Sequence, residues 1–166
     1  MTDTHDFWRR VLLAGLAIPA VEIGVWASVA PRGFFDTFPG GGRHWTVVDG
    51  PYNEHLVRDV GALYLALALV TVVALVTLGS LAVRIACWAG LLNGVPHLAY
   101  HLRHLSLYST SDKVANATSL SLGVIAPAIV LVLTWRGSRA PLPAPLENGT
   151  ERGGPIGHDA VDAEVQ

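Results

Sequence analysis

The sequence of 166 residues contains a single cysteine, Cys87. One thiol cannot form an intramolecular disulfide, and it cannot supply a zinc site built from several thiolates. Cys87 lies within an apolar segment. We therefore expect it to pack as a small hydrophobic side chain.

Charge is scarce as well. Charged residues make up 14% of the chain and hydrophobic residues 51%, whereas about a quarter of a soluble domain is charged. The net charge of −2 gives no electrostatic basis for binding nucleic acid. The few charges also avoid four long windows, which predicts an integral membrane protein with the lipid bilayer as its main partner.

Four segments are long and apolar enough to cross a hydrocarbon core of about 30 Å as helices. They cover approximately residues 11–30, 59–78, 81–101 and 114–135. The first segment also resembles a secretory signal peptide, because Ser28-Val29-Ala30 could be a cleavage site. Its length, Glu22 in its interior and Pro31 directly after the cut favour a retained helix.

The remaining segments complete an all-α, multi-pass four-helix bundle of the plasma or inner membrane. Residues 1–10 are predicted to be a cytoplasmic lead and residues 31–58 a long first extracytoplasmic loop. Aromatic residues in this loop are expected to fold back onto the membrane interface or over the helix ends. Residues 136–166 are rich in proline, glycine and acidic residues, which predicts a disordered cytoplasmic tail.

The third apolar segment has two distinct faces. At about 100° per residue, one face carries only small residues and histidines: Ala86, Gly90, Gly94, His97, His101 and His104. The opposite face is purely apolar. Small residues let membrane helices approach closely, so this face is predicted to pack inward and to open a polar site at its histidine end.

The spacing of His97, His101 and His104 could place three imidazoles on one metal ion. Imidazole nitrogens suit zinc, copper or iron, so a transition metal or haem is one hypothesis. The chain lacks a His-Glu-x-x-His signature. The alternative is a set of histidines that are hydrogen-bonded to Tyr, Ser or carboxylate partners.

Glu22 is the costliest residue in the apolar segments, since a carboxylate at membrane depth is disfavoured by about 2.5 kcal/mol or more. We expect it to be protonated, or paired with Arg58, His97 or Tyr64. Residues 54–59 offer two ion pairs at i, i+4 spacing, Glu54 with Arg58 and His55 with Asp59. Arg58 lies near the positive end of a helix dipole, so it is expected to have a further partner or a ligand.

These observations predict an outward-facing polar cavity that binds a small ligand, a lipid or a partner subunit. Its predicted lining is Glu22, Arg58, Asp59, Tyr64, Asn93, His97, Tyr100 and His101. One alternative is a metal or haem oxidoreductase that uses His97, His101 and His104. Another is a proton-coupled carrier in which Glu22 and His97 relay protons. A membrane-protein partner or a homo-oligomer is compatible with each.

The layout of Val11 to Trp135 resembles the small four-span bacterial proteins of the DoxX-like type. The shared features are an acidic residue in the first span, a long first loop, and the sequence Arg58-Asp59-Val60-Gly61 at the start of the second span. The resemblance implies a bacterial inner-membrane protein with redox or stress-related partners. It transfers no catalytic residues.

Overall fold

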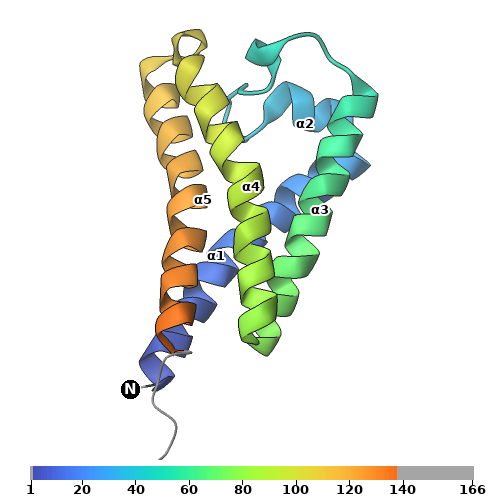
Figure 1. Cartoon of the computed structure of the whole chain (residues 1–166). Coiled ribbons are helices and arrows are strands. Elements are labelled where there is room, and N and C mark those ends of the chain that lie inside the picture. Colours follow the sequence, from blue (N-terminus) through green and yellow to red (C-terminus); the bar gives the residue numbers. More distant parts are fainter. Residues whose placement is uncertain (1, 138–166) are drawn as a thin grey trace, which may run out of the picture.

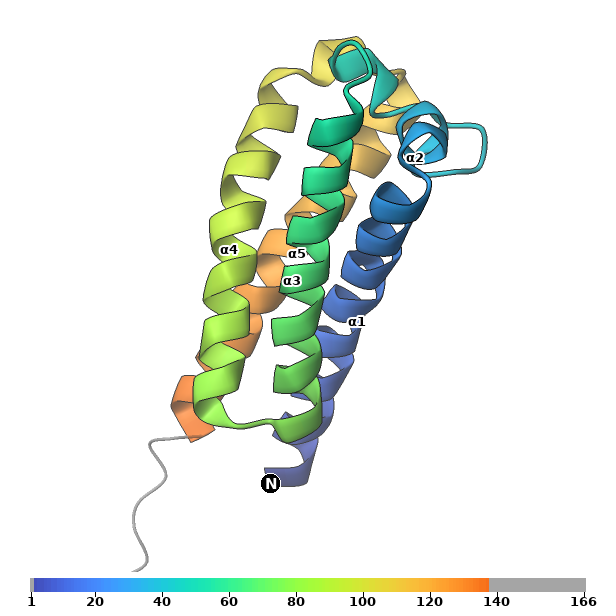
Figure 2. The same cartoon turned by 90° about the vertical axis from the view of Figure 1, so that its right-hand side faces the viewer.

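The computed structural model describes residues 2–137, and this part of the chain is all-helical. Four long helices run side by side (Figures 1 and 2). The α-helices are α1 (Thr2–Val29), α2 (Pro31–Thr37), α3 (Glu54–Thr77), α4 (Ser80–Arg103) and α5 (Thr110–Gly137). Two 3-10 turns, η1 (Val47–Asp49) and η2 (Leu105–Leu107), lie in the connections at one end of the molecule.

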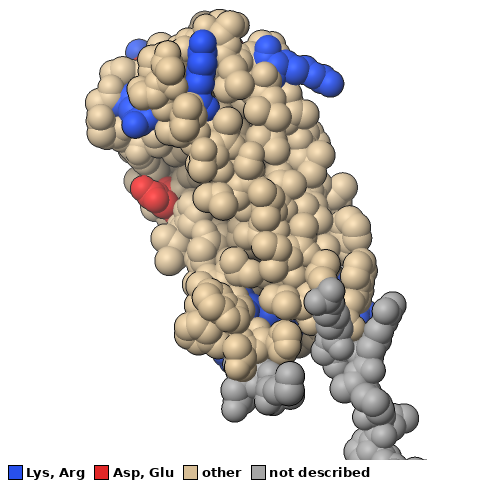
Figure 3. Space-filling model, turned by 90° about the vertical axis from the view of Figure 1, so that its left-hand side faces the viewer, with Lys and Arg blue, Asp and Glu red and all other residues tan. Residues whose placement is uncertain are grey.

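Three of the helices are long and apolar enough to cross a membrane: Thr4–Val29 within α1, Glu54–Thr77, and Thr110–Trp135 within α5. On the face shown in Figure 3, Lys and Arg lie towards the two ends of the molecule and the broad middle is free of them. This distribution is the one expected of a membrane protein. Helix α4 is as long as α3 but does not meet the same criterion, because residues such as Arg84, Asn93 and His97 lower its hydropathy.

The helices extend beyond the predicted apolar segments. Helix α1 begins at Thr2, inside the stretch predicted as a polar lead, and α3 begins at Glu54. The Asn53 side chain caps α3 by accepting a hydrogen bond from the Leu56 amide at 3.1 Å, as an N-cap asparagine does. The predicted first loop contains the short helix α2, which has Pro31 at its favoured first position. Most of the predicted tail, residues 138–166, lies outside the described residues.

The hydrophobic core at the end of the bundle near the N-terminus joins all four long helices. It is formed by Leu13, Ala74, Val83, Ala86, Cys87, Val130 and Leu131. Cys87 is only 1% exposed, which confirms that it packs as a small hydrophobic residue. Arg9 and Arg10 donate hydrogen bonds to the carbonyls of Leu78 and Leu75 at 3.0 and 2.8 Å. These cations therefore stabilise the negative C-terminal end of α3.

At the opposite end, residues 31–53 fold over the helices. Phe34 and Phe38 pack edge-on or tilted against each other and against Trp26 of α1, so these aromatic residues of the first loop lie against the end of α1. The same segment is tied to the start of α5, because Arg43 and the Trp45 indole both donate to the Asp112 carboxylate. Asp112 is thus the anchor for this cap.

Glycines decide which helices come closest. A Cβ on Gly61 of α3 would lie 2.8 Å from the Ser28 amide nitrogen, and one on Gly24 of α1 would lie 2.9 Å from the Leu65 amide nitrogen. Helices α1 and α3 are therefore in close backbone contact. A Cβ added to Gly94 of α4 would lie 3.3 Å from the Val124 side chain of α5. The small face of α4 therefore packs on α5, as predicted for this face.

Candidate functional site

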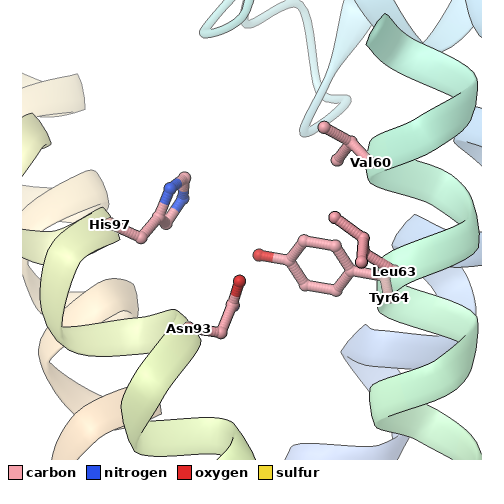
Figure 4. A pocket seen from close by; sticks show the side chains of 5 residues that line it. All are labelled: Val60, Leu63, Tyr64, Asn93 and His97. Carbon is pink, nitrogen blue, oxygen red and sulfur yellow. The ribbon is translucent and has the colours of Figure 1, made fainter.

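A cleft separates α3 from α4. Its polar end is a cavity of about 110 Å³ lined by Val60, Leu63, Tyr64, Asn93 and His97 (Figure 4). Its apolar part has a volume of about 410 Å³ and is lined by Leu63, Ala66, Leu67, Val70, Ala89, Leu92 and Asn93. Leu63 and Asn93 line both parts, so the two lie next to each other between α3 and α4. Asn93 and His97 are exposed, and the cleft is therefore open at the surface.

The polar side chains reach the cleft from two helices. Asn93 and His97 are four residues apart on α4 and therefore lie one helical turn apart on the same face. Tyr64 extends from α3 with its hydroxyl directed towards them (Figure 4). The Tyr64 hydroxyl interacts with the Asn93 side chain. A phenol, a carboxamide and an imidazole can each donate a hydrogen bond. The polar end thus offers three donors to a group that carries acceptor oxygens.

A chain of polar groups leads from this cavity to the end of the molecule capped by residues 31–53. The rings of His97 and His101 meet edge to face with their centroids 4.7 Å apart. His101 is 7% exposed, and its Nδ1 lies 3.1 Å from the Tyr108 hydroxyl. The Tyr108 hydroxyl also lies 3.4 Å from the Trp45 carbonyl oxygen, to which it can donate a hydrogen bond. The first loop therefore reaches the histidine face through Tyr108.

Two side chains at the capped end, Asp49 and Tyr108, have raised pKa values. Partial burial of its carboxyl raises the pKa of Asp49, and the opposing effects of His97, His104 and the Tyr108 hydroxyl are smaller. Burial, followed by the neighbouring Asp49, raises the pKa of Tyr108 to about 12. The Tyr108 phenol is therefore neutral at physiological pH and can act as a hydrogen-bond donor.

The three predicted metal ligands face different surroundings. His104 stacks on Tyr100 at a centroid distance of 4.2 Å, and its Nδ1 bonds to the Tyr100 carbonyl at 2.7 Å. His101 bonds to Tyr108, and His97 lines the cleft. Within residues 2–137, no group of three or more His, Cys, Asp or Glu side chains is arranged to hold a metal ion. The described histidines match the hydrogen-bonded alternative more closely.

Arg58 and Asp59 lie at the start of α3 and do not line the cleft. The predicted pairs are confirmed, with Arg58 2.9 Å from Glu54 and His55 3.1 Å from Asp59. Arg58 also donates to the Ser28 carbonyl at 2.5 Å. The further partner expected for Arg58 is therefore the C-terminal end of α1, where a positive charge is stabilising.

Glu22 is likewise not brought to the cleft. The buried face of α1 consists of Leu13, Ala17, Ala20, Gly24 and Ala27. Glu22 falls on the opposite face and is exposed. Among residues 2–137 it has no hydrogen-bond or ion-pair partner, and it does not pair with Arg58, His97 or Tyr64 as predicted. The spacing of the small residues in α1 is the signal that could have placed it.

Several lining residues were missed by the reasoning from sequence. The apolar part of the cleft gave no distinguishing signal, because leucines and alanines fill every span. Asp49 and Tyr108, which lie outside the cleft at the capped end, were also missed, because they lie in connections where periodicity carries no information. Of the predicted cavity residues, the structure gathers Tyr64, Asn93 and His97 in the cleft and places His101 behind them.

No protein-family model, curated protein or solved structure matches the chain.

Proposed function

We propose that the chain is a multi-pass membrane protein whose cleft between α3 and α4 binds a small amphipathic molecule that enters sideways from the bilayer. The observation that carries this proposal is the division of the cleft. Three hydrogen-bond donors lie at one end, and an apolar groove of about 410 Å³ lies next to them. This volume lies within the range of about 300–1,000 Å³ typical of small-molecule sites.

The proposal includes α4 as a fourth span. With 24 residues, it is about 36 Å long. The side chains that it exposes are largely apolar, namely Leu81, Ile85, Trp88, Leu92, Val95, Tyr100 and Leu102, and such a surface suits lipid. Four spans would put the start of α1 and the end of α5 on the same side of the membrane, and the polar end of the cleft would lie near the opposite, outward side. The bacterial inner-membrane location and the DoxX-like resemblance remain predictions.

The chemistry of the head group follows from the lining. Tyr64, Asn93 and His97 offer donors, and no Lys, Arg, Asp or Glu side chain lines either part of the cleft. A carboxyl, carbonyl or ester oxygen on a single apolar chain matches this arrangement. Binding would then combine one or two hydrogen bonds with close packing of the chain between α3 and α4.

A fatty acid that carries a photoreactive diazirine in its chain tests the proposal. In detergent or lipid vesicles it should label the purified full chain, whereas the matching diazirine alkane without a carboxyl group should label it much less. Loss of one hydrogen bond costs about 1 kcal/mol, so His97→Leu should weaken labelling about five-fold. His55→Leu is the control, since His55 is exposed outside the cleft. Equal labelling of His97→Leu and the unsubstituted chain would refute the proposal.

A further inference from the structure

In the proposed four-span arrangement, the polar end of the cleft lies at hydrocarbon depth. Tyr64 is ten residues after the start of α3 at Glu54, and His97 is six residues before the end of α4 at Arg103. At 1.5 Å per residue, both side chains start about 9–15 Å below the outer ends of these helices. A hydrocarbon core of about 30 Å leaves only about 3 Å of α4 outside at each end. The donors of the cleft are therefore below the level of lipid phosphate groups.

Neither wall of the cleft supplies a full charge at this depth. Residues 60–77 of α3 and 85–102 of α4 contain no Asp, Glu, Lys or Arg. Arg58, the only Arg or Lys of α3, is bound to Glu54 and to the Ser28 carbonyl of α1. A charged head group in the cleft would lose its hydration without gaining a counter-ion, which is costly within a membrane.

His97 is the lining side chain that a proton would make cationic. Its ring meets the His101 ring with the centroids 4.7 Å apart, and a charge on either ring at membrane depth is unfavourable. Neutral His97, the Tyr64 hydroxyl and the Asn93 carboxamide offer hydrogen bonds without a net charge. Asp49 of η1 does not line the cavity, but its charge acts on His97, which further disfavours an anionic head group.

The size and the entrance of the cavity restrict the ligand in the same direction. A volume of about 110 Å³ is about four times the volume of roughly 30 Å³ that a water molecule occupies in the liquid. The head group can therefore contain about four non-hydrogen atoms. The side chains beside the opening face lipid, since Leu63 and Leu92 are 63% and 75% exposed. A ligand that enters there must bring its head group through hydrocarbon, which a phosphate group does not do readily.

We infer that the ligand is a single-chain amphiphile with a small uncharged head group, such as a primary alcohol, a primary amide or a carboxylic acid that carries its proton. This inference rests on the proposed function and narrows its ligand to one chemical class. Tyr64, Asn93 and His97 hold the head group by hydrogen bonds, and the chain lies in the groove between α3 and α4. Phospholipids, fatty-acid anions and long-chain ammonium ions are excluded.

A set of diazirine probes with one common chain tests the inference on the full protein in lipid vesicles. Their head groups are a primary alcohol, a primary amide, a sulfonate and a trimethylammonium group, and the last two are permanently charged. Label on the groove residues of α3 and α4 is divided by label on Ile129 and Val132, which are exposed on α5. This ratio corrects for the amount of each probe in the bilayer. The ratio should be at least about ten-fold lower for the two charged probes than for the alcohol and the amide.

The outcomes separate this inference from the proposed function. A ratio for the sulfonate or the trimethylammonium probe as high as that for the alcohol would overturn the inference, whereas the proposed cleft would stand. If no probe labels the groove, the fatty acid included, the proposed function fails and the inference fails with it.

A cation added to the cleft gives a second readout. Asn93→Lys supplies the missing counter-ion and should raise groove labelling by the sulfonate about ten-fold. Val95→Lys is the matched control, because Val95 is 51% exposed on α4 and does not line the cleft. An unchanged helical content confirms that each variant folds, and the probe series on the unsubstituted chain needs no variant. Equal sulfonate labelling of the two lysine variants would show that charge does not exclude the sulfonate and would overturn the inference.

Discussion

The close contact between α1 and α3 makes a sharp prediction for Gly61. An alanine Cβ there would lie 2.8 Å from the Ser28 amide nitrogen and 3.0 Å from the Gly24 carbonyl oxygen, and it would also crowd the Ser28 hydroxyl. The first two are backbone atoms, which cannot rotate away, so α1 and α3 must separate. Overpacking of this kind costs about 1–3 kcal/mol. Alanine recovers about 1 kcal/mol through its higher helix propensity, which leaves a net loss of about 0–2 kcal/mol, whereas an unobstructed alanine would be stabilising.

Gly123→Ala is the matched control, because an added Cβ on this glycine of α5 meets nothing within 4 Å. It should be neutral or stabilising by up to about 1 kcal/mol. Unfolding by increasing fractions of SDS in mixed micelles, followed by circular dichroism, compares both variants with the unsubstituted chain. If Gly61→Ala unfolds at the same SDS fraction as Gly123→Ala, the close contact between α1 and α3 is wrong.

Two more predictions concern the capped end. The phenol of Tyr108 has a raised pKa of about 12 instead of 10.0, so its neutral form stabilises the fold below pH 10 and this contribution is lost as the pH rises towards 12. The tyrosinate absorbance that Tyr108→Phe removes should therefore appear near pH 12, and a midpoint near pH 10 would contradict its burial. Asp112→Asn weakens the ion pair with Arg43 while it keeps acceptor capacity for Trp45. With Asp112→Asn, a protease should therefore cut the segment 38–53 faster in limited proteolysis. Asp36→Asn removes a charge from an exposed pair with Arg32 and should leave the rate of this cleavage unchanged.

The sequence was sufficient for the approximate extent of the four long helices, because each of them contains a long apolar segment. It also identified the small face of α4, since the spacing of Ala86, Gly90 and Gly94 favours close packing against a neighbouring helix. The short helix α2 was missed because seven residues do not establish a periodicity. Helices α1 and α3 begin earlier than their predicted apolar segments, because the polar residues 2–10 and 54–58 are also helical.

The site was harder to predict because it depends on which helix faces approach. His97 and Asn93 were predicted from α4 alone, but their partnership with Tyr64 depends on how α3 is rotated. That rotation follows from Gly24 and Gly61, whose significance is visible only when the two helices are in contact. Glu22 was predicted to line the cavity because a buried partner would lower the free-energy cost of its carboxylate at membrane depth.

The position of photolabelling tests the central claim most directly. After irradiation with the diazirine fatty acid, peptide mass spectrometry should find the label concentrated on the groove residues of α3 and α4, between Leu63 and Val70 and between Ala89 and Leu92. Labelling should fall when an unmodified fatty acid competes. Label spread evenly over lipid-facing residues of all helices, such as Ile129 and Val132 of α5, and insensitive to competition would contradict a binding cleft between α3 and α4.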